Sequence, residues 1–163
     1  MSGTTRVGIG WDVHRLVAGR KFVLGGIVID HPKGPEGHSD ADPLFHAVAD
    51  AVLGAAGLGD LGERFSPSDP KWKDADSGSL LSHCLAEARS VGLNPAQADC
   101  IVILEEPHLG AHKEAIRRSV AQALGLADTA VNVKAKTAEG IGAVGAKEAI
   151  EAHALVVMER SRP

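Results

Sequence analysis

The sequence is poor in aromatic residues, which make up 3% of its 163 residues and include no Tyr. Proteins that bind single-stranded nucleic acids stack bases on aromatic side chains, so this scarcity speaks against that class. A long apolar run is also missing, because the best candidate, segment 48–58, is interrupted by Asp50 and is shorter than the ~20 residues that cross a bilayer. We therefore expect no nucleic-acid partner and no membrane-spanning segment.

Cysteine is equally scarce, with Cys84 and Cys100 as the two representatives. Two cysteines without a C-x-x-C spacing favour buried thiols in a reducing compartment over a disulfide framework. The first residues lead into the apolar segment that begins at Arg6 without the pattern of a targeting peptide. We therefore expect a cytoplasmic protein of bacterial type.

Apolar residues make up 44% of the chain and charged residues 23%, which is typical of a globular protein. This length suits one domain with its own core, so we expect residues 1–163 to form a single domain, with residues 1–5 flexible. The formal net charge is −4. An acidic protein that binds an anionic substrate must gather positive potential locally, through metal ions, helix N-termini or a few Lys and Arg side chains.

Gly and Pro residues divide the chain into alternating strand-like and helix-like segments. Apolar or alternating runs predict strands at 6–13 and 21–30, paired as a hairpin, and at 100–104, 131–136 and 152–159. Helical spacing predicts helices at about 43–56, capped by Asp40 or Asp42, at 77–91, capped by Ser77 or Ser79, and at 112–124. The long loop 57–76 is of the kind that carries function. Interleaved helices and strands favour an α/β sandwich with helices packed on one sheet.

Asp12 and His14 form the first chemical motif, because residues i and i+2 of a strand point to the same side. A carboxylate oxygen and an imidazole nitrogen suit zinc, which takes three protein ligands in catalytic sites. A third ligand is then required. The alternative interpretation of the pair is an exposed strand end with two polar residues.

His46 is the candidate third ligand, on the helix that follows the polar segment 37–42. Taken alone, it could equally be a satisfied polar residue on a mostly apolar helix. Asp50 lies four residues further along and shares a helix face with His46. It either orients the imidazole or faces solvent, and the sequence leaves both open.

The segment 134–140 places two Lys, Thr137 and Glu139 where a strand ends and a Gly-rich turn begins. Ammonium groups and a hydroxyl can hold phosphate oxygens, and a carboxylate is the hard ligand that magnesium prefers. The alternative is a solvated, charged strand end. That alternative is stronger for Lys134 than for Thr137 and Glu139, because the adjacent glycines let a ligand approach the backbone.

Four motifs together resemble the 2-C-methyl-D-erythritol 2,4-cyclodiphosphate synthase family: G-x-G-W-D-V-H at 8–14, G-H-S-D-A-D at 37–42, L-G-D-L-G at 58–62 and V-K-A-K-T-A-E at 133–139. The resemblance runs from Arg6 to about Glu159. It implies a lyase of the non-mevalonate isoprenoid pathway that converts 4-diphosphocytidyl-2-C-methyl-D-erythritol 2-phosphate into the 2,4-cyclodiphosphate and CMP. The implied fold is an α/β (α+β) single-domain sandwich with a mixed β-sheet covered by helices on one face, assembled as a homotrimer with active sites between subunits.

The resemblance also implies roles for individual residues. Asp12, His14 and His46 would bind one Zn²⁺ per active site, and Glu139 would bind a second divalent metal, Mg²⁺ or Mn²⁺. His38 and Thr137 would act on the substrate phosphates as catalytic residues. Further contacts to the substrate are implied for Ser39, Asp60, Leu61, Gly62, Phe65, Asp69 and Lys136, and contacts to the cytidine nucleotide for Leu104, Pro107, His108, Leu109 and Gly110.

Three positions depart from the family pattern. Ala143 and Ala146 stand where an aromatic residue and an Arg are common, which leaves Lys147 as a candidate replacement cation. His108 stands where Lys is common. The altered nucleotide-side residues, beside intact metal ligands, keep a diverged metal-dependent phosphohydrolase open as an alternative. A second alternative is a trimeric ligand-binding module without turnover, whose mark would be loss of the zinc ligands or of Thr137 and Glu139, all of which are present.

Overall fold

The computed structural model describes residues 5–66, 72 and 75–160. Asp69, one of the expected substrate contacts, lies outside these residues. In chain order the elements are β1 (Thr5–Ala18), β2 (Phe22–Leu24), β3 (Ile27–Ile29), β4 (Lys33–Pro35), α1 (Pro43–Ala56), α2 (Leu61–Arg64), α3 (Ser77–Ser90), β5 (Leu93–Ile103), α4 (Lys113–Leu124), the 3-10 turn η2 (Asp128–Ala130), β6 (Val131–Lys136), α5 (Gly142–Gly145) and β7 (Ala149–Arg160).

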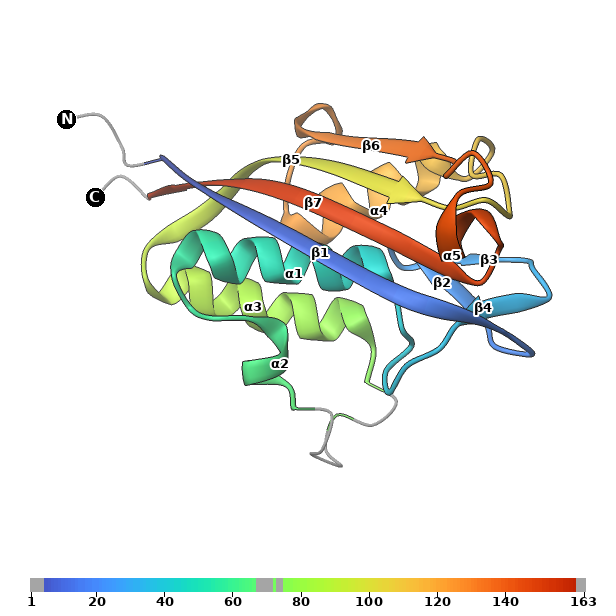
Figure 1. Ribbon diagram of the computed structural model, residues 1–163. Helices are drawn as coiled ribbons and strands as arrows, with labels where there is room; N and C mark the ends of the chain where they lie inside the picture. The colour runs from blue at the N-terminus through green and yellow to red at the C-terminus, as the bar shows by residue number, and fades with distance from the viewer. Residues whose placement is uncertain (1–4, 67–71, 73–74, 161–163) are drawn as a thin grey trace.

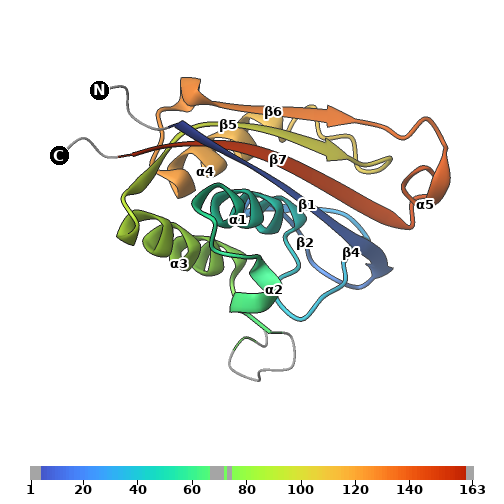
Figure 2. The ribbon, with the colours of Figure 1, turned by 60° about the vertical axis from the view of Figure 1, so that its left-hand side comes forward.

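Five of the strands form one mixed sheet in the order β4-β1-β7-β5-β6. The β5–β6 pair is parallel and the other pairs of this sheet are antiparallel, while β2 and β3 form a separate two-stranded hairpin. The helices α1, α3 and α4 pack on one face of the sheet (Figures 1 and 2). The predicted α+β fold, with a mixed sheet covered by helices on one face, is confirmed.

Two glycines of β1 bring α1 unusually close to the sheet. A Cβ atom added to Gly8 would lie 1.8 Å from the backbone oxygen of Ala51, and one added to Gly10 would lie 1.8 Å from that of Ala47. Any side chain at either position would therefore push the helix away. Because Asp12 continues the same alternation toward the N-terminus of α1, this close packing places it next to His46.

The other face of the sheet carries exposed apolar side chains. Val7, Ile9, Trp11 and Val13 alternate along β1 and are 55%, 74%, 53% and 41% exposed, and Leu155 of β7 is 37% exposed. Single exposed apolar residues are normal on a protein surface, but a contiguous strip marks an interaction site. Among the described residues, no helix is long and apolar enough to cross a membrane.

The N-terminal strands differ from the prediction. The expected strand 21–30 is two short strands, β2 and β3, joined by Gly25 and Gly26, both of which have a positive φ. β1 pairs with β4 and β7 and not with this hairpin. It begins at Thr5, a residue counted with the flexible N-terminal segment. The apolar pattern of residues 21–30 continues across Gly25 and Gly26, so it does not show that a turn divides the segment into two strands.

The remaining differences concern element ends. β5 begins at Leu93 and not at residue 100, because Asn94, Pro95 and a register shift between Pro95 and Gln97 hide its first half from a strand pattern. β7 likewise begins at Ala149 and not at residue 152. Asp76, not a serine, caps α3, by accepting from the Ser79 backbone N–H. The short elements α2, β4 and α5 were not predicted.

Candidate metal and substrate site

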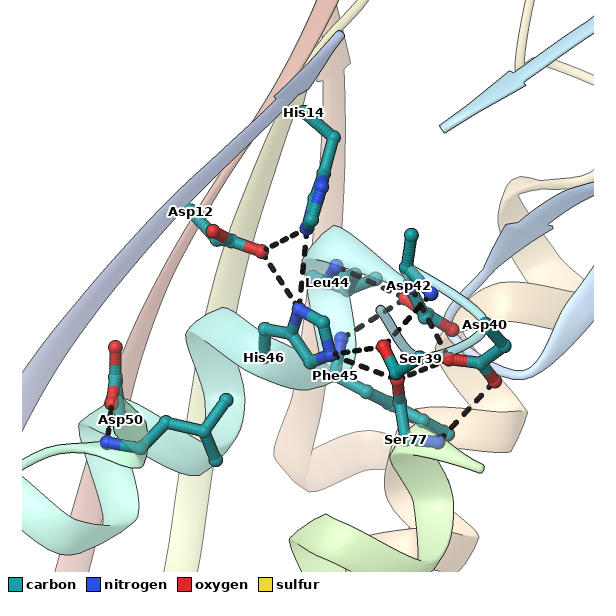
Figure 3. Close-up of polar contacts among 12 residues, drawn as sticks. Asp12, His14, Ser39, Asp40, Asp42, Leu44, Phe45, His46, Asp50 and Ser77 are labelled. Atoms are coloured by element: carbon teal, nitrogen blue, oxygen red, sulfur yellow. Dashed lines mark hydrogen bonds and ion pairs between the residues drawn. The ribbon is translucent and has the colours of Figure 1, made fainter. Parts of the chain in front are cut away.

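Asp12, His14 and His46 meet at the point where β1 passes the N-terminus of α1. The Oδ2 atom of Asp12 lies 2.8 Å from Nε2 of His14 and 2.9 Å from Nδ1 of His46, and these two nitrogens are 3.3 Å apart. One donor atom from each residue lies within 4.8 Å of the others. Figure 3 shows the three side chains pointing toward one another from two elements. This donor set fits a divalent metal ion.

The nitrogen of each imidazole that faces away from the donor cluster has a partner of its own. Nδ1 of His14 lies 2.6 Å from the backbone oxygen of Glu36. Nε2 of His46 lies 2.9 Å from Oγ of Ser77 and 3.2 Å from Oγ of Ser39. These contacts fix both rings with the other nitrogen turned toward Asp12.

The electrostatics of the cluster favour an ionised carboxylate. Burial alone would raise the pKa of Asp12, but its contacts with the imidazoles of His14 and His46 outweigh this effect and lower that pKa to about 2. For His14, burial acts to lower the pKa, and the Asp12 carboxylate reverses this and raises it. The cluster therefore offers an anionic oxygen at neutral pH.

The polar segment before α1 is held by its own carboxylates. The carboxylate of Asp42 is fully buried and accepts from the backbone N–H groups of Leu44 and Phe45, which makes Asp42 and not Asp40 the helix cap. It also accepts from Gly25 and Gly26, which ties the β2–β3 hairpin to α1. This anchor fixes the start of the helix that carries His46.

Asp40 has a different partner, which a capping pattern does not predict. Its carboxylate accepts hydrogen bonds from the Oγ and the backbone N–H of Ser77, the first residue of α3. Ser77 is 1% exposed. Sequence reasoning treated both residues as helix caps and missed this contact, because it joins segments 37 residues apart.

Asp50 neither orients the imidazole of His46 nor simply faces solvent, the two roles that the sequence left open. Its Oδ1 atom accepts a 2.7 Å hydrogen bond from the backbone N–H of Leu61, so it holds the loop that carries Asp60, Leu61 and Gly62. Burial raises the pKa of Asp50, although this hydrogen bond acts in the opposite direction. Asp60 caps the short helix α2 through the Glu63 N–H.

A pocket opens beside the metal-ligand candidates. The residues lining it are His14, His38, Ser39, His46, Leu61, Gly62, Phe65, Trp72 and Leu80. His38 is exposed at its edge. The rings of Phe65 and Trp72 meet edge to face at 4.7 Å between centroids and form an apolar wall. The structure therefore brings seven of the expected site residues to this one pocket.

The end of β6 forms a second, separate cluster. Thr137 donates through Oγ1 to Oε1 of Glu139 over 2.7 Å, and Lys136 and Glu139 are exposed. A second pocket here is lined by Leu104, His108, Leu109, Gly110, Lys113, Ala135, Lys136 and Thr137, and it shares no lining residue with the first. Pro107 is half-buried beside it. Within one chain, Lys136, Thr137 and most of the expected nucleotide contacts thus line a different pocket from His14 and His46.

Several charged side chains near this second cluster have structural partners. Lys134 pairs with Asp99 over 2.6 Å. Lys147, the candidate replacement for an arginine, pairs with Glu106 over 2.5 Å. The ring of His153 lies 6.5 Å from the ring of Trp11, centroid to centroid. His83 is exposed and borders the Phe65–Trp72 wall.

The chain is similar to a known protein family in both sequence and structure. The model of the YgbB family matches residues 5–159. The 2-C-methyl-D-erythritol 2,4-cyclodiphosphate synthase of Salinibacter ruber is 50% identical over 154 residues, which cover 94% of this chain and 98% of the relative. The structure of the bifunctional IspDF from Campylobacter jejuni gives a TM-score of 0.94 at 36% identity over 98% of this chain, which spans 43% of that longer chain. A structure of 2C-Methyl-D-erythritol-2,4-cyclodiphosphate Synthase described as the bound form with CDP gives a TM-score of 0.87 at 35% identity, over 94% of this chain and 99% of the other.

Proposed function

We infer that this chain, which belongs to the YgbB family, is an enzyme of isoprenoid biosynthesis that converts 4-diphosphocytidyl-2-C-methyl-D-erythritol 2-phosphate into 2-C-methyl-D-erythritol 2,4-cyclodiphosphate and CMP. The observation that carries this conclusion is the convergence of the Asp12, His14 and His46 donor atoms at the wall of one pocket. His38 and Ser39 line that pocket too. A cation beside groups that can donate to phosphate oxygens suits a diphosphate substrate.

The metal assignments extend this proposal. Asp12, His14 and His46 would hold Zn²⁺, because two imidazole nitrogens and one carboxylate oxygen match a catalytic zinc site that keeps a fourth position open. Glu139 would hold Mg²⁺ or Mn²⁺, since an exposed carboxylate beside a hydroxyl is a hard oxygen ligand. When bound, such cations supply Lewis-acid polarisation and neutralise charge on phosphate oxygens.

The separation of the two pockets supports an active site shared between copies of the chain. The phosphate-binding residues Lys136, Thr137 and Glu139 would reach the metal pocket of a neighbouring copy, within a homotrimer. The exposed strip of Val7, Ile9, Trp11 and Val13 supports self-association, because burying it against other copies removes apolar surface from water. The cytidine base would lie in the pocket of Leu104, Leu109 and Gly110, since a relative is described in a CDP-bound form.

The reaction needs no covalent intermediate between the substrate and the protein. An oxygen of the 2-phosphate attacks the β-phosphorus, a new P–O bond forms, and the bond to the bridging oxygen breaks with its electron pair leaving on CMP. The nucleophile is already an anion, so the residues must hold two negatively charged groups together. His38 and Ser39 would orient one phosphate, while Lys136 and Thr137 would donate to the other. Leu61, Gly62 and Phe65 would enclose the methylerythritol carbon chain.

Phosphorus NMR of the purified protein with this substrate, Zn²⁺ and Mg²⁺, beside a chelated control, tests the proposal. Formation of CMP together with the cyclic diphosphate is the expected result. Formation of CMP with only linear phosphates would instead identify a metal-dependent phosphohydrolase. Bound zinc without any turnover would identify a ligand-binding module.

A further inference from the structure

Ser77 is a buried polar residue next to the metal-ligand candidates, and the reaction described above does not use it. It is 1% exposed, and its Oγ atom has two side-chain partners, the carboxylate of Asp40 and Nε2 of His46. Ser77 belongs to α3, whereas Asp40 and His46 flank the start of α1 (Figure 3). A buried hydroxyl that joins a carboxylate to an imidazole fixes the direction of both hydrogen bonds.

The proton order along this chain of contacts follows from the donor inventory. An ionised carboxylate only accepts, so the hydroxyl proton of Ser77 points to Asp40. The lone pairs of Oγ then face Nε2 of His46 at 2.9 Å, and this favours the tautomer with the proton on Nε2. Nδ1 is left with a free lone pair, directed toward Asp12 and His14. This is the tautomer that can bind a metal.

The other tautomer of His46, with the proton on Nδ1, is also stabilised in this site. Asp12 Oδ2 lies 2.9 Å from Nδ1 of His46, so a proton on Nδ1 would make a charge-assisted hydrogen bond to the carboxylate. That arrangement blocks the lone pair needed for coordination. Without an acceptor at Nε2, the metal-free site would favour this blocked form.

We propose that Ser77, oriented by Asp40, is a positioning residue that holds His46 in the tautomer and ring orientation competent to bind the metal. The proposal rests on the metal site of the proposed function and names the residues that tune it. Neither Ser77 nor Asp40 is a ligand, since both lie on the far side of the imidazole from Asp12. Their effect is exerted through His46 alone.

Comparison with His14 shows why Ser77 is the informative position. The outer nitrogen of His14 contacts a backbone oxygen, that of Glu36, which no substitution removes. Ser39 also approaches Nε2 of His46, but at a longer distance of 3.2 Å, and its Oγ already accepts from the Ala41 N–H over 3.0 Å. Ser77 is therefore the closer acceptor, and a carboxylate orients its hydroxyl.

The test is a titration of the metal-free, full-length protein with Zn²⁺ and, for its visible spectrum, with Co²⁺. Ser77→Ala is expected to raise the dissociation constant roughly 10–100-fold, the usual effect of removing the outer partner of a metal-binding histidine. The Co²⁺ bands should also change in position or intensity, which lost fold stability alone would not produce. Ser79→Ala is the matched control, because this exposed serine of α3 bonds to Asp76 and not to the site.

Asp40→Asn provides a second, independent variant that conserves size. An Asn at this position can accept only one of the two hydrogen bonds that Ser77 donates, so a smaller loss of affinity is expected. Because Asp40 acts through Ser77, the double variant should bind no more weakly than Ser77→Ala alone. Circular dichroism and thermal unfolding of the metal-free proteins check that each variant folds.

Three outcomes would overturn the proposal. Unchanged Zn²⁺ affinity in a folded Ser77→Ala protein, beside tight binding by the unmodified protein, would contradict the role of Ser77 and leave the metal site intact. If Ser77→Ala does not fold, unchanged affinity in Asp40→Asn would contradict the proposal in the same way. Failure of the unmodified protein to bind either ion would contradict the metal site, and the proposal with it.

Discussion

The metal-ligand candidates on β1 and α1 are largely enclosed, whereas the phosphate-binding candidates at the end of β6 lie open. The side chains of Asp12, His14 and His46 are 25%, 16% and 12% exposed, and each imidazole has an outer partner. Lys136 and Glu139 are exposed, and Glu139 has a described contact with Thr137. One cluster is therefore enclosed within the chain, and the other is open at its surface.

Removing a residue of the enclosed cluster should have the largest effect. We expect His46→Ala to lose its metal on dialysis against a chelator and to lower kcat/KM by roughly 10³-fold or more, because two ligands are too few for a catalytic zinc site. Metal analysis and the rate of CMP release measure both. His112→Ala is the control, since this side chain makes no capping hydrogen bond at the start of α4. Full activity in a metal-free His46→Ala protein would refute the ligand assignment.

Removing a residue of the open cluster should separate activity from zinc binding. Glu139→Gln is expected to lower activity by roughly 10²-fold and to raise the Mg²⁺ concentration needed, while the zinc content stays unchanged. Rates measured over a series of Mg²⁺ concentrations test this. Loss of zinc from this variant would show that the two clusters are not independent.

Substitutions in the enclosed cluster should also lower the free energy of unfolding more than substitutions in the open cluster. Asp42→Ala removes the buried carboxylate that accepts from four backbone N–H groups, so we expect a loss of about 3 kcal/mol in the free energy of unfolding. Thr137→Ala should cost less than about 0.5 kcal/mol, because it removes one partly exposed contact. Urea unfolding of both variants gives the two values. Equal losses would contradict the contrast between an enclosed and an open cluster.

The smallest effect concerns the two buried thiols. Cys84 lies in α3 and Cys100 in β5, next to Val133 of β6. Burial raises the pKa of both thiols to about 12, so roughly one thiol in 10⁴ is ionised at pH 8. We expect almost no labelling by a thiol reagent at pH 8 until the protein unfolds. Labelling of Cys100 before the protein unfolds would show that the core at β5 and β6 opens locally.

Much of the enclosed cluster could be predicted from local sequence rules. Alternation on a strand places Asp12 and His14 on one side, and Pro43 with an acidic cap predicts the start of α1 three residues before His46. Close packing at Gly8 and Gly10 then brings the two elements together. In the open cluster, β6 was predicted with the observed bounds, Val131–Lys136.

The contacts that the sequence could not reveal join distant segments. Ser77 and Asp40 each resemble a helix cap, and only the packing of α3 against α1 shows that they bond to each other. Asp50 likewise holds Leu61 from another element. Local patterns describe which groups are present, whereas tertiary packing decides which of several equivalent partners each group meets.

In the proposed active site, the enclosed cluster of one copy works with the open cluster of another. Mixing His46→Ala and Glu139→Ala chains under conditions that exchange subunits tests it directly. Each variant alone should be nearly inactive, but randomly mixed assemblies should recover roughly a quarter of the unmodified activity, because about one shared site in four combines two intact halves. Mass spectrometry confirms that mixed assemblies form. No recovery of activity in those mixed assemblies would contradict the shared site.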